Sequence, residues 1–231
     1  MLSTVSDFID TSDDNFIGVF LYGSQNYGLG TDESDVDTIQ IIRSAKKAKQ
    51  EMELPNGKMK TYTLKHFLYR LKQGDMECYE ILYTEHKITN PLYEEILNNF
   101  IREFSDCMNY DRVRLALFKK LNEHLCHVLW MIKNPDNARY NKKRLYWAMR
   151  VHNQLARINN GEDFESSLMY RADDGYDMLK IKSVTNYLSF KDFNYIFKNL
   201  NDYIHSLPRY SNAVTEEEER CISNFYMSMH L

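Results

Sequence analysis

The sequence predicts an α/β (α+β) fold, in which a small mixed-sheet domain with flanking helices is followed by an all-α helical domain. Apolar segments rich in β-forming residues are confined to the part before Thr63, and apolar residues after Thr63 recur at helical spacing. With 231 residues, 43% of them hydrophobic, the chain can build two small cores. We place the domains at residues 1–95 and 96–231.

Strands are expected first. Residues 15–22 (NFIGVFLY) form an apolar run that ends at Gly23, which is typical of a buried strand followed by a turn. A glycine-rich loop leads to residues 35–43 (DVDTIQIIR), which predict a second strand. Residues 46–63 predict a hairpin that turns at Pro55-Asn56-Gly57.

The remaining segments are predicted to be helices, because each begins at a capping residue or ends at a helix breaker. A turn is expected at Asp173-Asp174-Gly175. Thr215 with Glu218 predicts a capping box for the last helix. The expected helices are 63–72, 75–83, 90–104, 111–133, 138–160, 189–207 and the segment from 215.

Composition and charge restrict the class of protein. The net charge of −4 gives no overall attraction to nucleic acid, so any polyanion site must come from local clustering. The four cysteines lie far apart without a CxxC pair, which favours a reduced protein. The first residues lack a basic start and an apolar segment, and no apolar run reaches the length of a membrane span. We expect a cytoplasmic protein without a membrane partner.

A phosphate-binding loop is predicted directly after the first strand. Gly23 lets the backbone turn sharply, so that its N–H groups can approach a phosphate, and Ser24 adds a hydroxyl donor. A lone Gly-Ser pair after a strand is usually a turn. Here the loop returns to a second strand that begins with Asp35 and Asp37, and this order is hard to obtain by chance.

A metal site is predicted at these two aspartates. Side chains at positions i and i+2 of a strand point to the same face, which brings Asp35 and Asp37 side by side. Two neighbouring carboxylates repel each other unless a cation lies between them. Oxygen ligands of this kind suit a hard cation, Mg²⁺ or Mn²⁺, which neutralises triphosphate charge and activates an attacking hydroxyl.

The segment GSQNYGLGTDESDVD (residues 23–37) resembles the signature of the DNA polymerase β-like nucleotidyltransferase superfamily. Tyr27 and Gly28 make it similar to a bacterial and phage branch of predicted nucleotidyltransferases, some of which accompany RNA-repair ligases. The resemblance implies nucleotide binding, for instance of ATP, by the loop with Tyr27 and Ser34. It also implies transfer of a nucleoside monophosphate from the triphosphate to an acceptor hydroxyl.

Two later segments resemble the same branch. TLKHFLYRLKQGDMECYEILY (63–83) is similar to its helix pair, and KRLYWAMRVHNQLARINNG (143–161) to a later basic helix. In that helix one stripe is formed, at spacings of four and three residues, by Lys143, Trp147, Arg150, Gln154 and Arg157. The resemblance implies phosphate contacts for Lys143 and Arg150. A basic stripe can otherwise be a solvated helix face.

The resemblance also implies a third carboxylate from a later strand, expected near residues 58–62 (KMKTY). None of these residues is acidic. Glu51, Glu53 and Glu80 are the candidates to replace it, and the sequence does not choose among them.

The predicted function is therefore a nucleotidyltransferase whose nucleoside triphosphate lies between the two domains. The acceptor is an RNA 3′ end such as that of tRNA, a protein side chain or a small molecule, and the sequence leaves these open. Two alternatives remain. The first, suggested by the missing acid, is a catalytically inactive nucleotide-binding module, and the second is an interaction protein that acts through its helical half.

Overall fold

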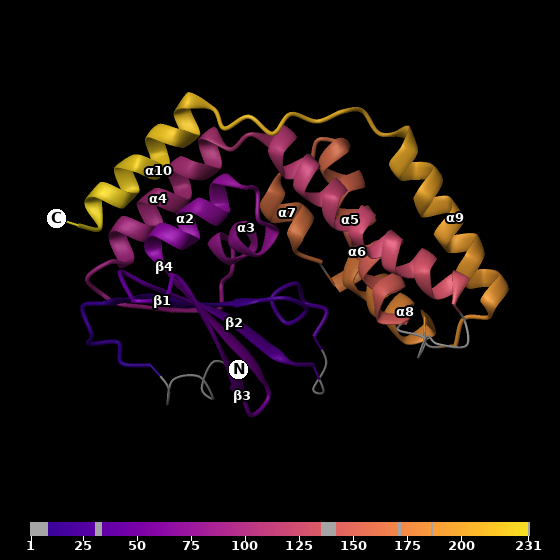
Figure 1. The fold of residues 1–231 in the computed structure, drawn as a ribbon, viewed down its shortest axis with the longest axis horizontal. Coiled ribbons are helices and arrows are strands. Elements are labelled where there is room, and N and C mark those ends of the chain that lie inside the picture. Colours follow the sequence, from indigo (N-terminus) through magenta and orange to yellow (C-terminus); the bar gives the residue numbers. More distant parts are fainter. Residues whose placement is uncertain (1–8, 31–33, 135–141, 171, 186, 231) are drawn as a thin grey trace. The chain divides into compact units, whose positions relative to one another are not determined.

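A computed structural model describes residues 9–30, 34–134, 142–170, 172–185 and 187–230 (Figure 1). The chain divides into two compact units, which are described in turn. The first comprises Met1–Tyr110 with Ala213–Leu231, and the second is Asp111–Asn212. A mixed five-stranded sheet with flanking helices and a set of C-terminal helices confirm the predicted fold class.

The first unit is built on the mixed sheet. Its strand order is β3-β4-β2-β1-β5. β2 runs parallel to β4, and the other neighbouring strands are antiparallel. The two predicted strands and the hairpin are confirmed, whereas β5 was not foreseen because three residues carry no periodicity. The strands are β1 (Phe16–Tyr22), β2 (Val36–Ile42), β3 (Lys49–Leu54), β4 (Gly57–Thr63) and β5 (Lys87–Thr89).

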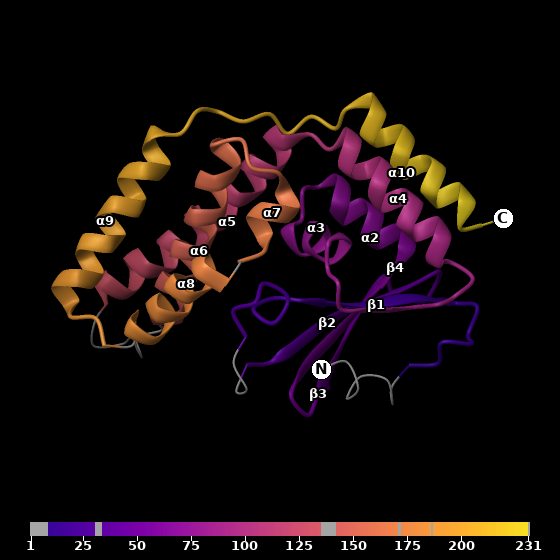
Figure 2. The same cartoon turned by 180° about the vertical axis from the view of Figure 1, so that it is seen from behind.

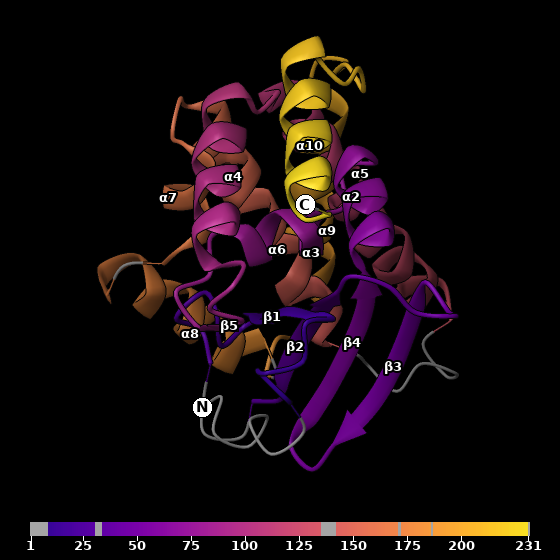
Figure 3. The same cartoon turned by 90° about the vertical axis from the view of Figure 1, so that its left-hand side faces the viewer.

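Four helices of this unit lie on one face of the sheet (Figures 1 and 3). They are α2 (Leu64–Lys72), α3 (Met76–Leu82), α4 (Glu94–Cys107) and α10 (Glu216–Ser228). The opposite face carries a smaller apolar cluster of Phe16, Val19 and Met59. The predicted caps of α2 and α3 are confirmed, since Thr63 accepts from the backbone N–H of His66 and Asp75 from that of Glu77.

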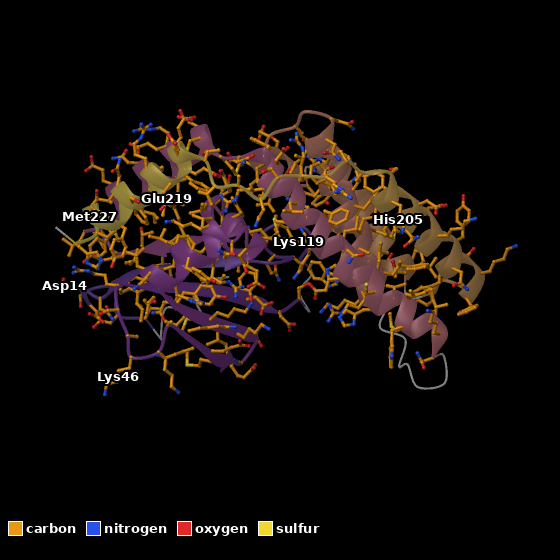
Figure 4. The ribbon with its side chains drawn as sticks, turned by 45° about the horizontal axis from the view of Figure 1, so that its top comes forward. Asp14, Lys46, Lys119, His205, Glu219 and Met227 are labelled. Carbon is orange, nitrogen blue, oxygen red and sulfur yellow. The ribbon has the colours of Figure 1, made fainter. Side chains whose placement is uncertain are left out.

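The last helix packs on α4, far from it in the sequence. The rings of Phe100 and Phe225 stack with their centres 4.0 Å apart. Glu218 is fully buried, completes the predicted capping box with Thr215, and accepts a hydrogen bond of 3.0 Å from the backbone of Asn109. Glu219, labelled in Figure 4, lies 2.5 Å from Lys72 of α2. The predicted boundary at 95/96 thus falls inside α4, a helix that belongs with the sheet.

The second unit is helical (Figure 2). Its helices are α5 (Tyr110–Lys133), α6 (Lys142–Asn159), α7 (Phe164–Leu168), α8 (Ala172–Thr185) and α9 (Phe190–Ser206). α5 and α6 run antiparallel, because Arg114 donates to the carbonyl of Ile158 while Arg144 lies 3.4 Å from the ring of His124. α6 also contacts α7, α8 and α9.

Two helix predictions need correction. The turn expected at residues 173–175 is wrong, because these residues lie within α8 and the helix accommodates Gly175. The helix expected from residue 90 begins at Glu94, since Asn90 instead accepts from the backbone of Leu92 in a preceding turn. Residues 138–141 of the predicted basic helix lie outside the described residues. No helix of the described part of the chain has the length and apolarity needed to cross a membrane.

Candidate active site

The loop after β1 is a compact turn. Gly23 has φ +81°, a conformation that only glycine adopts without strain. The carbonyl of Gly23 accepts from the backbone N–H of Asn26, and that of Ser24 accepts from Leu29, each at 3.0 Å. Ser24 is half-buried. The backbone around these two residues is thus fixed before any ligand arrives, as a phosphate-binding loop requires.

The loop and the predicted metal ligands lie next to each other. Asp37 is the cross-strand partner of Tyr22, the residue before Gly23. A β-carbon built on Gly23 would lie 4.0 Å from Oδ2 of Asp37. Asp35 directly precedes β2 and is exposed. A phosphate held at Gly23 would therefore meet the Asp37 carboxylate at the distance that a bridging cation spans.

Gln25 joins the two ends of the loop, and the sequence analysis missed it. Its Nε2 donates to the carbonyl oxygen of Ser34 at 3.2 Å. A β-carbon on Gly30 would lie 2.1 Å from Oε1 of Gln25, so Gly30 leaves room for this side chain. Ser34 thus takes part in the loop through its backbone. A polar residue in a glycine-rich loop gives no local signal of such a contact.

Two neighbouring side chains of the loop, those of Tyr27 and Asn26, are buried. The Tyr27 ring is 1% exposed, so it packs inside the loop, and its part in nucleotide binding stays a prediction. Its neighbour Asn26 is 2% exposed, and neither polar atom of its amide has a hydrogen-bond partner among the described residues. Buried polar groups are normally paired. The Asn26 amide is therefore a candidate ligand-binding group.

The strand expected to supply a third carboxylate supplies lysines instead. Asp37 is paired in parallel register with Lys58 of β4. Glu51 on β3 lies 3.8 Å from the Lys58 ammonium, and Glu53 is exposed on the same strand. Glu80 is 5% exposed within α3. None of the three replacement candidates comes directly beside Asp37 in the sheet register.

A second ion pair lies on the helix-covered face of the sheet. The Lys60 ammonium is 2.6 Å from the carboxylate of Glu77 in α3 and 4.9 Å from the centre of the Tyr22 ring. Burial raises the pKa of Tyr22 well above its usual value, and the negative charges of Glu77 and Asp37 raise it further. Lys60 thus joins β4 to α3 and to the ring of Tyr22.

The residues fit a cation that arrives with a triphosphate. Within the described residues, no group of three or more His, Cys, Asp or Glu side chains could hold a metal ion. Mg²⁺ commonly binds through one or two carboxylates together with substrate phosphates and water. Asp35 and Asp37 beside the Gly23 turn meet that requirement, whereas they do not form a cage for a permanently bound ion.

The two predicted basic residues belong to α6 in the second unit, and their place at the site stays a prediction. Lys143 is exposed, whereas Arg150 is 6% exposed with its guanidinium 4.9 Å from the centre of the Trp147 ring. Gln154, in the same stripe, is 1% exposed. The stripe is thus not a solvated helix face.

Arg157, the last residue of the stripe, has a structural role. Its guanidinium donates two bonds of 2.6 Å to the carboxylate of Glu162 and others to the carbonyls of Ser166, Ser167 and Met169. These contacts join the end of α6 to α7.

Comparison with known proteins finds likeness to solved structures alone. No protein-family model matches the chain, and no curated protein matches it. Among solved structures, a nucleotidyltransferase-like protein from Exiguobacterium sibiricum 255-15 is similar, with 13% sequence identity and a TM-score of 0.38. The match covers 87% of this chain and 72% of that one.

Proposed function

We propose that the protein is a Mg²⁺-dependent nucleotidyltransferase that transfers a nucleoside monophosphate from a nucleoside triphosphate to an acceptor hydroxyl. One observation carries the proposal: the positive-φ turn at Gly23 lies against Asp37, with a distance of 4.0 Å from a β-carbon position on Gly23 to Oδ2. Phosphate donors and cation ligands are thus combined at the end of β1 and the start of β2. The order of motifs in the sequence supports the same function.

Each residue has a defined part in this reaction. Backbone N–H groups after Gly23 and the Ser24 hydroxyl bind the phosphates. Asp35 and Asp37 hold Mg²⁺, which neutralises phosphate charge and lowers the pKa of the acceptor hydroxyl. The acceptor oxygen bonds to the α-phosphorus while the bond to the bridging oxygen of pyrophosphate breaks, and the hydroxyl proton passes to water. Gln25 keeps the loop closed around the triphosphate.

The experiment has a binding stage and a turnover stage. A thermal-shift screen with the four ribonucleoside triphosphates, with and without Mg²⁺, should show a Mg²⁺-dependent rise in melting temperature for at least one. Pyrophosphate release is then measured with that nucleotide and with bulk tRNA, a denatured protein mixture or no acceptor. Asp37→Asn serves as the matched inactive variant. Stimulation by tRNA would favour an RNA 3′ end, and labelling of protein would favour a side-chain acceptor.

A nucleotide-binding module without transfer activity is the second candidate. The lysines of β4, at the strand where a third carboxylate is expected, favour it, because Lys58 is the register partner of Asp37. Mg²⁺-dependent triphosphate binding without pyrophosphate release under any of the three conditions would select this candidate. If neither Mg²⁺ nor nucleotide changes the melting temperature, the alternative of an interaction protein acting through its helices gains support.

A further inference from the structure

A buried lysine lies on the sheet face that carries Asp37. Lys60 of β4 is 8% exposed. Its ammonium lies 2.6 Å from Oε2 of Glu77, in the first turn of α3, and 4.9 Å from the centre of the Tyr22 ring in β1. A carboxylate and an aromatic face both attract an ammonium. Lys60 is thus held in one place by two partners from different elements.

The Lys60 ammonium and the Tyr22 ring meet across β2. The strand order places β2 between β4 and β1, so this contact between a β4 and a β1 side chain spans β2. Lys60 is the register partner of Ile39, two residues from Asp37 on the same face. Tyr22 is the cross-strand partner of Asp37. Lys60 therefore lies on the same face of the sheet as Asp37. Its register position is two residues further along β2 than Asp37.

The other lysine on this face of β4 is directed elsewhere. Lys58 is the direct register partner of Asp37, but its ammonium lies 3.8 Å from Glu51 on β3, on the opposite side of β4 from β2. Its side chain is 37% exposed, compared with 11% for Lys60. Of these two lysines, Lys60 is thus the more enclosed, and its partners lie on α3 and β1 instead of β3.

A fixed ammonium at this point affects how many cations the site accepts. Two-metal sites hold their ions about 3.5–4 Å apart and use carboxylates that can serve both ions. The described residues offer no group of three such ligands. An enclosed ammonium donates to phosphate oxygens without metal ligands of its own, and with its partner Glu77 it occupies the place of a second dication.

We propose that this site binds one divalent cation with the triphosphate, through Asp35 and Asp37, and that the Lys60 ammonium takes the place of a second. Glu77 is a positioning residue that holds this ammonium toward β2. The inference rests on the proposed function and deepens it, because it defines the cation requirement of the same site.

The number of bound ions tests the inference. The full chain is saturated with an α,β-methylene triphosphate, which cannot be cleaved, and titrated with Mn²⁺ while free Mn²⁺ is followed by electron paramagnetic resonance. We expect one Mn²⁺ per chain. In Lys60→Gln we expect a second, weaker Mn²⁺, because the ammonium is gone and Glu77 is released. Lys65→Gln, which removes an exposed lysine of α2, should still bind one.

The outcomes separate the inference from the proposed function. Two ions in the wild-type chain would overturn the inference and leave the proposed function standing. One ion in Lys60→Gln, shown to be folded by its circular dichroism, would overturn the role given to Lys60. Failure of the wild-type chain to bind the analogue with Mn²⁺ would overturn both. The wild-type count needs no variant and is decisive by itself.

Discussion

Tyr22 and Asp37 are cross-strand partners at the point where β1 ends and β2 begins. This pairing brings the turn at Gly23 against the first strand-borne carboxylate, although 13 residues separate them in the sequence. The Tyr22 ring in turn lies 4.9 Å from the Lys60 ammonium. The relationship makes the following predictions specific.

Asp35→Asn and Asp37→Asn should each remove the Mg²⁺-dependent rise in melting temperature caused by triphosphate, while the fold is kept. The reason is that an amide replaces a charged oxygen ligand on a residue outside the apolar core. Asp14→Asn, at an exposed aspartate labelled in Figure 4, is the matched control. Wild-type binding by both Asp35→Asn and Asp37→Asn would rule out the metal site.

Ser24→Ala should weaken triphosphate binding by about 0.5–3 kcal/mol, the range for one hydrogen bond, with the upper end for a charged partner. Gly23→Ala should weaken it more, because a side chain at φ +81° strains the turn next to the phosphates. Gly161→Ala is the matched control, since Gly161 of the second unit has φ +91° and open space around the position of its β-carbon. Both glycine variants should lose stability, and only Gly23→Ala should lose affinity, as measured by calorimetry.

Asn26→Leu should raise the free energy of unfolding by about 1 kcal/mol and weaken triphosphate binding. The variant removes a buried amide that has no hydrogen-bond partner among the described residues, and leaving such a group unpaired costs about 1–3 kcal/mol. Urea unfolding and nucleotide titration measure the two effects separately. A more stable protein with unchanged affinity would show that the amide does not contact the ligand.

Arg150→Ala should weaken triphosphate or tRNA binding. Wild-type affinity should fall steeply as salt rises, and the affinity of the variant less steeply, because each lost phosphate contact lowers the salt slope. Asn141, on the same helix, lies outside the described residues, so exposed Arg102 of α4 provides the control variant Arg102→Ala. Affinities are compared at low and high salt. Loss of triphosphate affinity places α6 at the active site, and loss of tRNA affinity alone makes it an acceptor track. If neither affinity falls, Lys143 and Arg150 are not residues of the active site.

His124 should make the protein less stable in mild acid. Burial, together with the positive charges of Lys120 and Arg144, lowers the pKa of His124 to about 3. As the pH falls, His124 therefore binds a proton in the unfolded state at a higher pH than in the folded state. The contribution of neutral His124 to the free energy of unfolding is complete above pH 6.5 and is lost as the pH falls toward 3. The loss is up to about 1.4 kcal/mol per pH unit.

Urea unfolding between pH 4 and 7 measures this dependence. His124→Gln should show a flatter dependence of unfolding free energy on pH than the wild type. His205→Gln, which changes an exposed histidine of α9 labelled in Figure 4, should keep the wild-type slope. Equal slopes in all three proteins would assign the acid sensitivity to other groups.

The sequence by itself determined the features that depend on local chemistry. The apolar run before Gly23, the hairpin turn at Gly57 and the caps at Thr63, Asp75 and Thr215 all appear where they were predicted. A cap or a turn is decided by a few adjacent residues, so its signal survives without tertiary context.

Only the tertiary structure decided the features that depend on partners distant in sequence. The three-residue strand β5 exists because β1 offers it an edge, and α10 joins the first unit because Phe225 stacks on Phe100. Lys60 reads as an ordinary polar strand residue until Glu77 and Tyr22 are seen around it. The Tyr27 ring is likewise buried by its surroundings, which no pattern in the loop reveals. The burial of a side chain and its ion pairs depend on neighbours that only folding brings together. These neighbours decide where the Lys60 charge lies on the sheet face that carries Asp37.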